Sequence, residues 1–73
     1  MLIGIYENGE LVANPKTATT TNISTHQTKT GFEIRLGWTM TNLGTVLSDF
    51  DRIEDATEVA ILVSRCLTTG GAR

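Results

Sequence analysis

The sequence predicts an α+β domain: a three- or four-stranded antiparallel sheet with two C-terminal helices packed on one face. Three observations predict this fold. An Asn-Gly pair between apolar runs indicates an N-terminal β-hairpin, apolar and polar residues alternate over residues 31–40, and the apolar spacing then becomes helical. With 73 residues, the chain is expected to form a single small domain, residues 1–73.

The hairpin is expected within LIGIYENGELVA, residues 2–13. Asn8-Gly9 favours a two-residue type I′ turn, because both central residues of that turn need positive φ. Such a turn pairs Tyr6 with Leu11. Pro15 cannot donate to a ladder, so the second strand either ends there or runs along an edge of the sheet.

Residues 15–30 are rich in threonine, and Ile23 is the only large apolar residue among them. Threonine favours extended backbone. A segment with so few apolar side chains can bury little surface, so two interpretations remain open. The segment is either an exposed edge strand or a mobile loop.

Residues 31–40, GFEIRLGWTM, predict the central strand of the sheet. Large apolar residues alternate with smaller or polar ones, which is the pattern of a strand with one buried face. These residues are expected to form the largest block of the core: Phe32, Ile34, Leu36, Trp38 and Met40.

Residues 43–50 predict the first helix. Their apolar residues recur at three- and four-residue steps: Leu43, Val46, Leu47 and Phe50. Gly44 would cost about 1 kcal/mol in a helix interior. A strand over Thr45–Phe50 therefore remains the alternative.

A second helix is predicted from about Ala56, with Asp55-x-x-Glu58 as a capping pattern and Gly70-Gly71 as its end. The side chains expected to face the sheet recur at helical spacing: Ala56, Val59, Ala60, Val63, Cys66 and Leu67.

This helix also carries apolar residues on its opposite face, where Ile61 and Leu62 lie between Glu58 and Arg65. Burying each of them would contribute about 1.5–3 kcal/mol. We therefore expect a homo-oligomer whose interface contains Ile61, Leu62 and Arg65. There are two alternatives. In the first, the first helix or the threonine-rich segment covers this patch. In the second, Val59–Val63 is a strand.

The sequence contains no recognisable catalytic set. Ser24 and His26 are neighbours, but we expect the chain around them to be mobile and His26 to be solvated, whereas catalysis needs rigid placement. One histidine and one cysteine cannot form a zinc site, and Cys66 is expected to be buried and inert. The protein is predicted not to be an enzyme and to hold no metal or cofactor.

The net charge of −2 gives no basic surface for nucleic acid, so a nucleic-acid partner is not expected. No apolar stretch is long enough to span a membrane. The first ten residues do not resemble a signal peptide, and the expected compartment is the cytoplasm.

The one concentration of charge is acidic. Within ten residues lie five of the eight carboxylates, accompanied only by Arg52: Asp49, Asp51, Glu54, Asp55 and Glu58. Acidic residues favour helix N-termini, which explains them without a function. The functional interpretation is a surface that binds a basic partner protein.

Together these features predict a small non-enzymatic binding or inhibitory protein that occupies the surface of a partner protein, as a homodimer or larger homo-oligomer. One alternative is a protein that sequesters a nucleotide-like ligand between subunits, with Arg35 and Trp38 as contacts.

Two resemblances bear on these alternatives. A strand followed by two helices resembles the ribbon-helix-helix DNA-binding regulators, whose outward strand residues would here include Glu33 and Arg35. IYENG in an opening hairpin, followed by strands and then helices, resembles the element order of some small phage-encoded inhibitors, certain anti-CRISPR proteins among them. Neither resemblance assigns a role to a residue.

Overall fold

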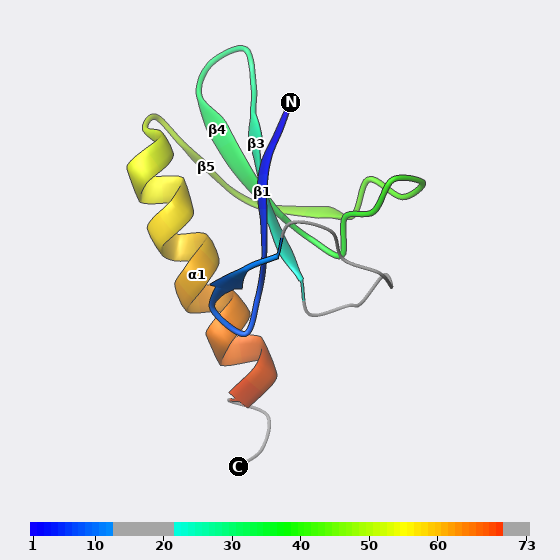
Figure 1. Ribbon diagram of the computed structural model, residues 1–73. Coiled ribbons are helices and arrows are strands. Elements are labelled where there is room, and N and C mark those ends of the chain that lie inside the picture. The colour runs from blue at the N-terminus through cyan, green and yellow to red at the C-terminus, as the bar shows by residue number, and fades with distance from the viewer. Residues whose placement is uncertain (13–21, 70–73) are drawn as a thin grey trace.

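The computed structural model describes residues 1–12 and 22–69 (Figure 1). Within these ranges the elements, in chain order, are β1 (Leu2–Glu7), β2 (Glu10–Leu11), β3 (Ile23–Gln27), β4 (Phe32–Leu36), β5 (Thr45–Phe50) and α1 (Ile53–Thr69). The strands form one antiparallel sheet in the order β2-β1-β3-β4-β5. The predicted α+β class is confirmed. The sheet has five strands rather than three or four, and the described part of the chain holds one helix rather than two.

The hairpin of β1 and β2 forms as predicted. Asn8 and Gly9 both have positive φ, at 53° and 80°. Tyr6 pairs with Leu11 across the turn. The Asn-Gly pair adopts this conformation cheaply, because glycine has no Cβ and asparagine tolerates the left-handed region.

β3 corrects the prediction for residues 15–30. Ile23–Gln27 is neither a loop nor an edge strand, because it pairs with β1 on one side and β4 on the other. Ile23, Ser24 and Thr25 are fully buried. The place of β3 in the middle of the sheet buries the polar side chains of Ser24 and Thr25, although their composition does not demand burial. Residues 15–21 lie outside the described part of the chain.

β4 is shorter than the predicted strand over residues 31–40. Gly37 has a φ of 75°, which bends the chain away after Leu36. Trp38 and Met40 therefore leave the strand, and Met40 is exposed rather than part of the core. Phe32 and Ile34 pack in the core as expected.

The predicted helix over residues 43–50 is wrong, and the alternative strand over Thr45–Phe50 is correct. Gly44 has a φ of 70°, which a right-handed helix excludes. Because β5 lies at an edge of the sheet, Val46 and Leu47 remain exposed where a helical stripe would have buried them.

α1 begins at Ile53 rather than Ala56. Ala56, Ala60 and Ser64 are fully buried, and their small side chains bring the helix close to the sheet. Cys66, predicted to be buried, is exposed, because it projects from another side of the helix than these three residues. Leu67 is exposed as well. The predicted stop at residues 70–71 lies outside the described ranges. α1 is the one helix among the described residues. It is not long and apolar enough to cross a membrane.

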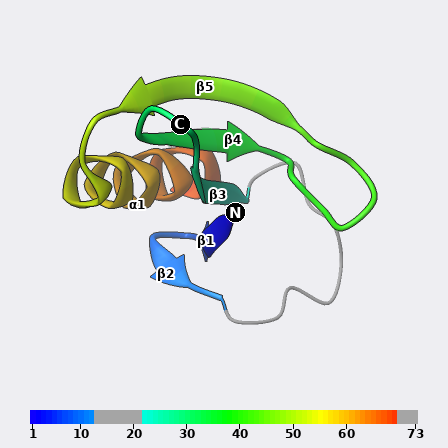
Figure 2. The same cartoon turned by 90° about the horizontal axis from the view of Figure 1, so that it is seen from above.

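α1 covers one face of a strongly twisted sheet (Figure 2). The core lies between them and contains Tyr6, Ile23, Ile34, Ala56 and Ala60. Because side chains alternate along a strand, the neighbours of these core residues point to the opposite side of the sheet. We call this side the second face. It carries Ser24, His26, Glu33 and Arg35, which pair across β3 and β4.

Candidate functional site

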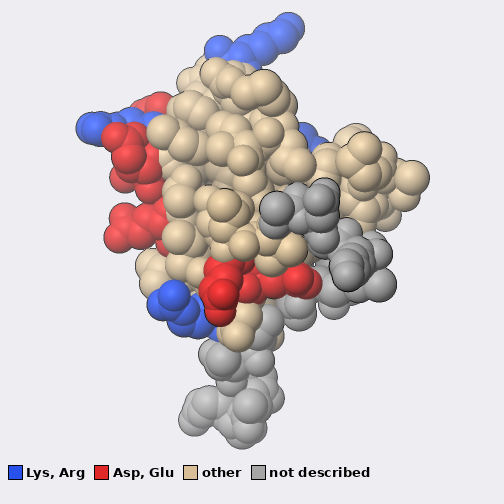
Figure 3. All heavy atoms as spheres, in the orientation of Figure 1, with Lys and Arg blue, Asp and Glu red and all other residues tan. Residues whose placement is uncertain are grey.

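The five clustered carboxylates lie around the connection from β5 into α1, with Asp49 pairing with Glu33 and therefore pointing to the second face of the sheet. Asp49 lies on β5, Asp51 in the connection, and the other three on the first turns of the helix. We call this region the acidic surface: Asp49, Asp51, Glu54, Asp55 and Glu58. All five residues are exposed. Figure 3 shows acidic atoms gathered along the side of the molecule where α1 begins.

The acidic surface is well placed for an interaction with positive charge. Glu54 and Asp55 lie in the first turn of α1, where the helix dipole favours negative charge. Arg52 forms an ion pair with Glu54 at 3.4 Å, and both side chains are largely exposed. An exposed pair of this kind contributes little to stability. One arginine cannot neutralise five carboxylates, so the region stays negative.

Next to the acidic surface, β5 exposes apolar side chains. Its only strand neighbour among the described residues is β4. Leu43, Val46 and Leu47 are exposed on β5 and just before it. We call the unpaired side of β5, with these three side chains, the β5 edge.

His26 and Ser24 form a buried pair on the second face. The His26 Nε2 atom lies 2.7 Å from the Ser24 Oγ atom. His26 is 7% exposed, and its ring meets the Trp38 ring edge-on at a centroid distance of 5.2 Å. The expectation of a solvated loop histidine is wrong, because β3 is a central strand. Ser24 is fully buried, so its hydroxyl has no path to a substrate in this conformation.

Arg35 and Glu33 extend this cluster along β4. The Arg35 guanidinium forms an ion pair with the Glu33 carboxylate. Its Nη1 atom also donates to the Leu43 carbonyl oxygen at 3.1 Å. The predicted ligand contacts Arg35 and Trp38 are therefore both engaged with the chain itself, Arg35 with Glu33 and Leu43 and Trp38 with His26.

The environment of His26 lowers its pKa from 6.5. Burial is the largest cause, the positive charge of Arg35 adds to it, and Glu33 partly opposes it. The folded state therefore binds this proton more weakly than the unfolded state. The contribution of His26 to stability is complete above pH 6.5 and is lost as the pH falls through the folded-state pKa.

We expect the free energy of unfolding of the wild-type chain to decrease on acidification below pH 6.5. Urea titrations at several pH values would measure this. His26→Gln is the control, because it keeps a side-chain nitrogen near Ser24 but does not titrate. The same acid-dependent loss in His26→Gln and wild type would show that His26 is not its source.

The structure separates the three predicted interface residues of the helix. Ile61 packs against the core of its own chain. Arg65 lies beside the β1–β2 turn, where a Cβ atom added to Gly9 would be 2.7 Å from its Nε atom. Leu62 is 51% exposed. The covering of Ile61 within the chain removes part of the reason for expecting a second copy at this helix.

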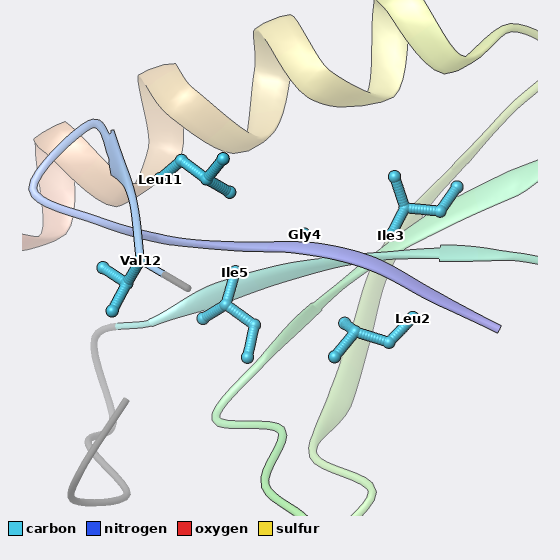
Figure 4. A pocket seen from close by; sticks show the side chains of 6 residues that line it. All are labelled: Leu2, Ile3, Gly4, Ile5, Leu11 and Val12. Carbon is cyan, nitrogen blue, oxygen red and sulfur yellow. The ribbon is translucent and has the colours of Figure 1, made fainter. Parts of the chain in front are cut away.

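A groove that the sequence did not indicate lies where β1 extends beyond the short β2 (Figure 4). Its volume is about 210 Å³, and its lining is apolar: Leu2, Ile3, Gly4, Ile5, Leu11 and Val12. This is below the roughly 300–1,000 Å³ typical of small-molecule sites. Neither Arg35 nor Trp38 lines the groove, so it does not correspond to the predicted ligand site.

Within residues 1–12 and 22–69, no three His, Cys, Asp or Glu side chains are grouped so that they could hold a metal ion. No protein-family model, curated protein or solved structure matches this chain. Any function must therefore be argued from the residues of this chain.

Proposed function

We propose that the protein is a non-enzymatic binding protein that uses its acidic surface to occupy, and so inhibit, a basic surface of a partner protein. The observation that supports this most is the exposure of all five carboxylates within residues 49–58, a stretch whose only Lys or Arg is Arg52. Such a region speeds association with a positively charged partner and disfavours acidic ones.

We expect Asp49→Lys combined with Asp51→Lys to weaken capture of basic proteins strongly, because both substitutions turn attraction into repulsion. The immobilised variant and wild type would be exposed to the same extract, and captured proteins quantified by mass spectrometry. The captured set should be enriched in basic proteins, and its recovery should fall as salt rises.

A control variant raises the net charge equally but away from the acidic surface: Glu10→Lys with Met40→Lys and Thr41→Lys. All three positions are exposed. This variant should capture the same proteins as wild type. Equal capture by the Asp49/Asp51 variant, with an unchanged circular dichroism spectrum, would disprove a role for the acidic surface.

The described contacts do not favour the other candidate functions. Arg35 and Trp38 are engaged within the chain, which gives no support to a nucleotide-like ligand. A ribbon-helix-helix regulator needs two helices after its strand and a strand free to enter DNA. Here β4 is paired on both sides, and one helix follows the strands in the described ranges.

Two further expectations remain predictions. One is a homo-oligomer, for which the exposed Leu62 is the best remaining contact on α1. A native mass equal to that of one chain would disprove it. The other is a cytoplasmic location, and localisation of a tagged chain outside the cytoplasm would disprove that.

A further inference from the structure

We propose that the partner adds an extended segment of its own chain to β5, and that this segment alternates apolar with basic residues. This inference rests on the proposed function and specifies how the partner is bound. It is supported by the side of β5 that pairs with no strand of the described residues, by the apolar side chains next to it, and by the carboxylates at its end.

The backbone of β5 has hydrogen-bonding groups that point away from the sheet. In the β3–β4 pair, Thr28 N donates to Gly31 O at 2.8 Å, and Gly37 N donates to Asn22 O at 3.1 Å. In an antiparallel pair, every second residue exchanges backbone hydrogen bonds with its partner. Glu33 is two residues from Gly31, so its N–H and C=O also point toward β3.

The same alternation continues into β5. The backbone groups of Phe32 and Ile34 point toward β5, where they meet Phe50 and Ser48. Asp49 lies between these two partners, so its N–H and C=O point outward. Past the irregularity in register, Val46 lies opposite Arg35, whose groups point toward β3, and the backbone of Val46 points outward as well. These are the groups that an added strand would bind.

The β5 edge has only two of the features that usually hinder strand addition, an irregularity in register between Val46 and Ser48 and the charged Asp49. It is six residues long and contains no proline, lysine or arginine. Natural edge strands are commonly protected by such residues or by being very short. β2, at the other edge of the sheet, has two residues. β5 is therefore the better template for an added strand.

The side chains around β5 specify the chemistry of the partner. Val46 and Leu47, with Leu43 just before the strand, offer apolar contacts, and Asp49 and Asp51 lie at the other end. Main-chain hydrogen bonds would supply affinity, and alternate side chains of the added strand would supply specificity. Lysine or arginine opposite Asp49 is favourable, because opposite charges attract across strands.

A second copy of this chain fits the β5 edge less well. In an antiparallel pairing of two copies, Asp49 of each would lie beside the apolar N-terminal half of the other β5 and meet no positive charge. A basic segment of another protein supplies that charge.

The test uses two short synthetic peptides, one alternating lysine and valine and the other alternating glutamate and valine. Each would be titrated into the ¹⁵N-labelled wild-type chain. The lysine–valine peptide should bind and shift the amides of Val46 and Asp49 more than those of β2. The glutamate–valine peptide should not bind. No binding of the lysine–valine peptide, or shifts confined to β1 and β2, would overturn the proposal.

Val46→Pro removes an outward N–H while leaving the groups that bind β4 in place. We expect it to weaken binding of the lysine–valine peptide by about tenfold or more, which equals about 1.4 kcal/mol. Met40→Pro is the matched control, because Met40 is exposed in the turn between Thr39 and Asn42. It should bind as wild type does. If Val46→Pro is unfolded, the mapped amide shifts of the wild-type chain decide the question.

The outcomes for the two proposals differ. Loss of partner capture on reversing Asp49 and Asp51, with full capture by a folded Val46→Pro, supports the acidic surface and overturns strand addition. Loss of capture in both variants supports both proposals. Unchanged capture in both overturns both.

Discussion

Ile34→Ala is expected to lower the free energy of unfolding by about 2–5 kcal/mol, the range found when large core side chains are cut back to alanine. Ile34 is 1% exposed and packs in the cluster formed by the sheet and α1. Its removal leaves a cavity next to Ala56 and Ala60, whose short side chains cannot fill the space.

The effect should be large relative to the stability of the whole domain. A domain of this size buries only about 60% of its unfolded surface and is correspondingly marginal. Urea titrations followed by circular dichroism would measure the change. Val46→Ala is the control on the neighbouring strand, where the side chain is 46% exposed. Its effect should stay within about 0.5 kcal/mol. Similar losses for the two variants would contradict the core assignment.

The second large effect is expected for Gly44→Ala, which should destabilise the fold more than Gly37→Ala. Both glycines have positive φ, at 70° and 75°. A Cβ atom at Gly44 would lie 2.6 Å from the Leu36 carbonyl oxygen and 2.8 Å from Trp38 N. Both of these are backbone atoms, so a side-chain rotation cannot relieve the contact.

Gly37→Ala measures the cost of the left-handed conformation alone, without the close backbone contacts found at Gly44. A Cβ atom at Gly37 would meet nothing within 4 Å. Gly37→Ala should therefore lose only about 1–2 kcal/mol, the cost of a left-handed conformation for a residue with a Cβ atom. Thermal or urea unfolding of both variants would give the difference. If Gly37→Ala proves equally damaging, the close approach at Gly44 is not the cause.

Gly44→Ala should also affect the β5 edge, because Gly44 immediately precedes β5 and contacts the end of β4. Displacement of this connection would move Val46 relative to the sheet. Weaker binding of the lysine–valine peptide to folded Gly44→Ala would agree with this.

The hairpin could be predicted because its signal is local. Asn8-Gly9 determines the turn, and the turn determines that Tyr6 faces Leu11. The strand of residues 32–36 was also recognisable from its alternation. The extension to residue 40 failed because Gly37 can continue a strand or turn away from it, and the alternation alone does not distinguish these.

β3 and β5 were misassigned because their surroundings, rather than their composition, determine their structure. Ser24, Thr25 and His26 are buried by strands on both sides, although little in their side chains demands burial. In β5 the helical spacing of its apolar residues was coincidental. The positive φ of Gly44 prevents a helix there, and pairing with β4 makes Thr45–Phe50 a strand.

The candidate site was predictable where its residues are adjacent in sequence. The acidic surface occupies residues 49–58, and it stays together whether residues 43–50 are helix or strand. The contact between His26 and Trp38 and the open edge of β5 depend on the order of the strands in the sheet. No local pattern contains that order, so neither feature could be predicted.

The position of α1 after all the strands has a consequence for synthesis on the ribosome. The Gly9 amide donates to the Ser64 hydroxyl across 55 residues of sequence, at 2.9 Å. The hairpin thus emerges long before the helix that holds it in place. Until α1 has been made, Tyr6, Ile23 and Ile34 have no cover. The nascent sheet is therefore a species that chaperones can bind, and folding is expected to be completed in one step after α1 is released.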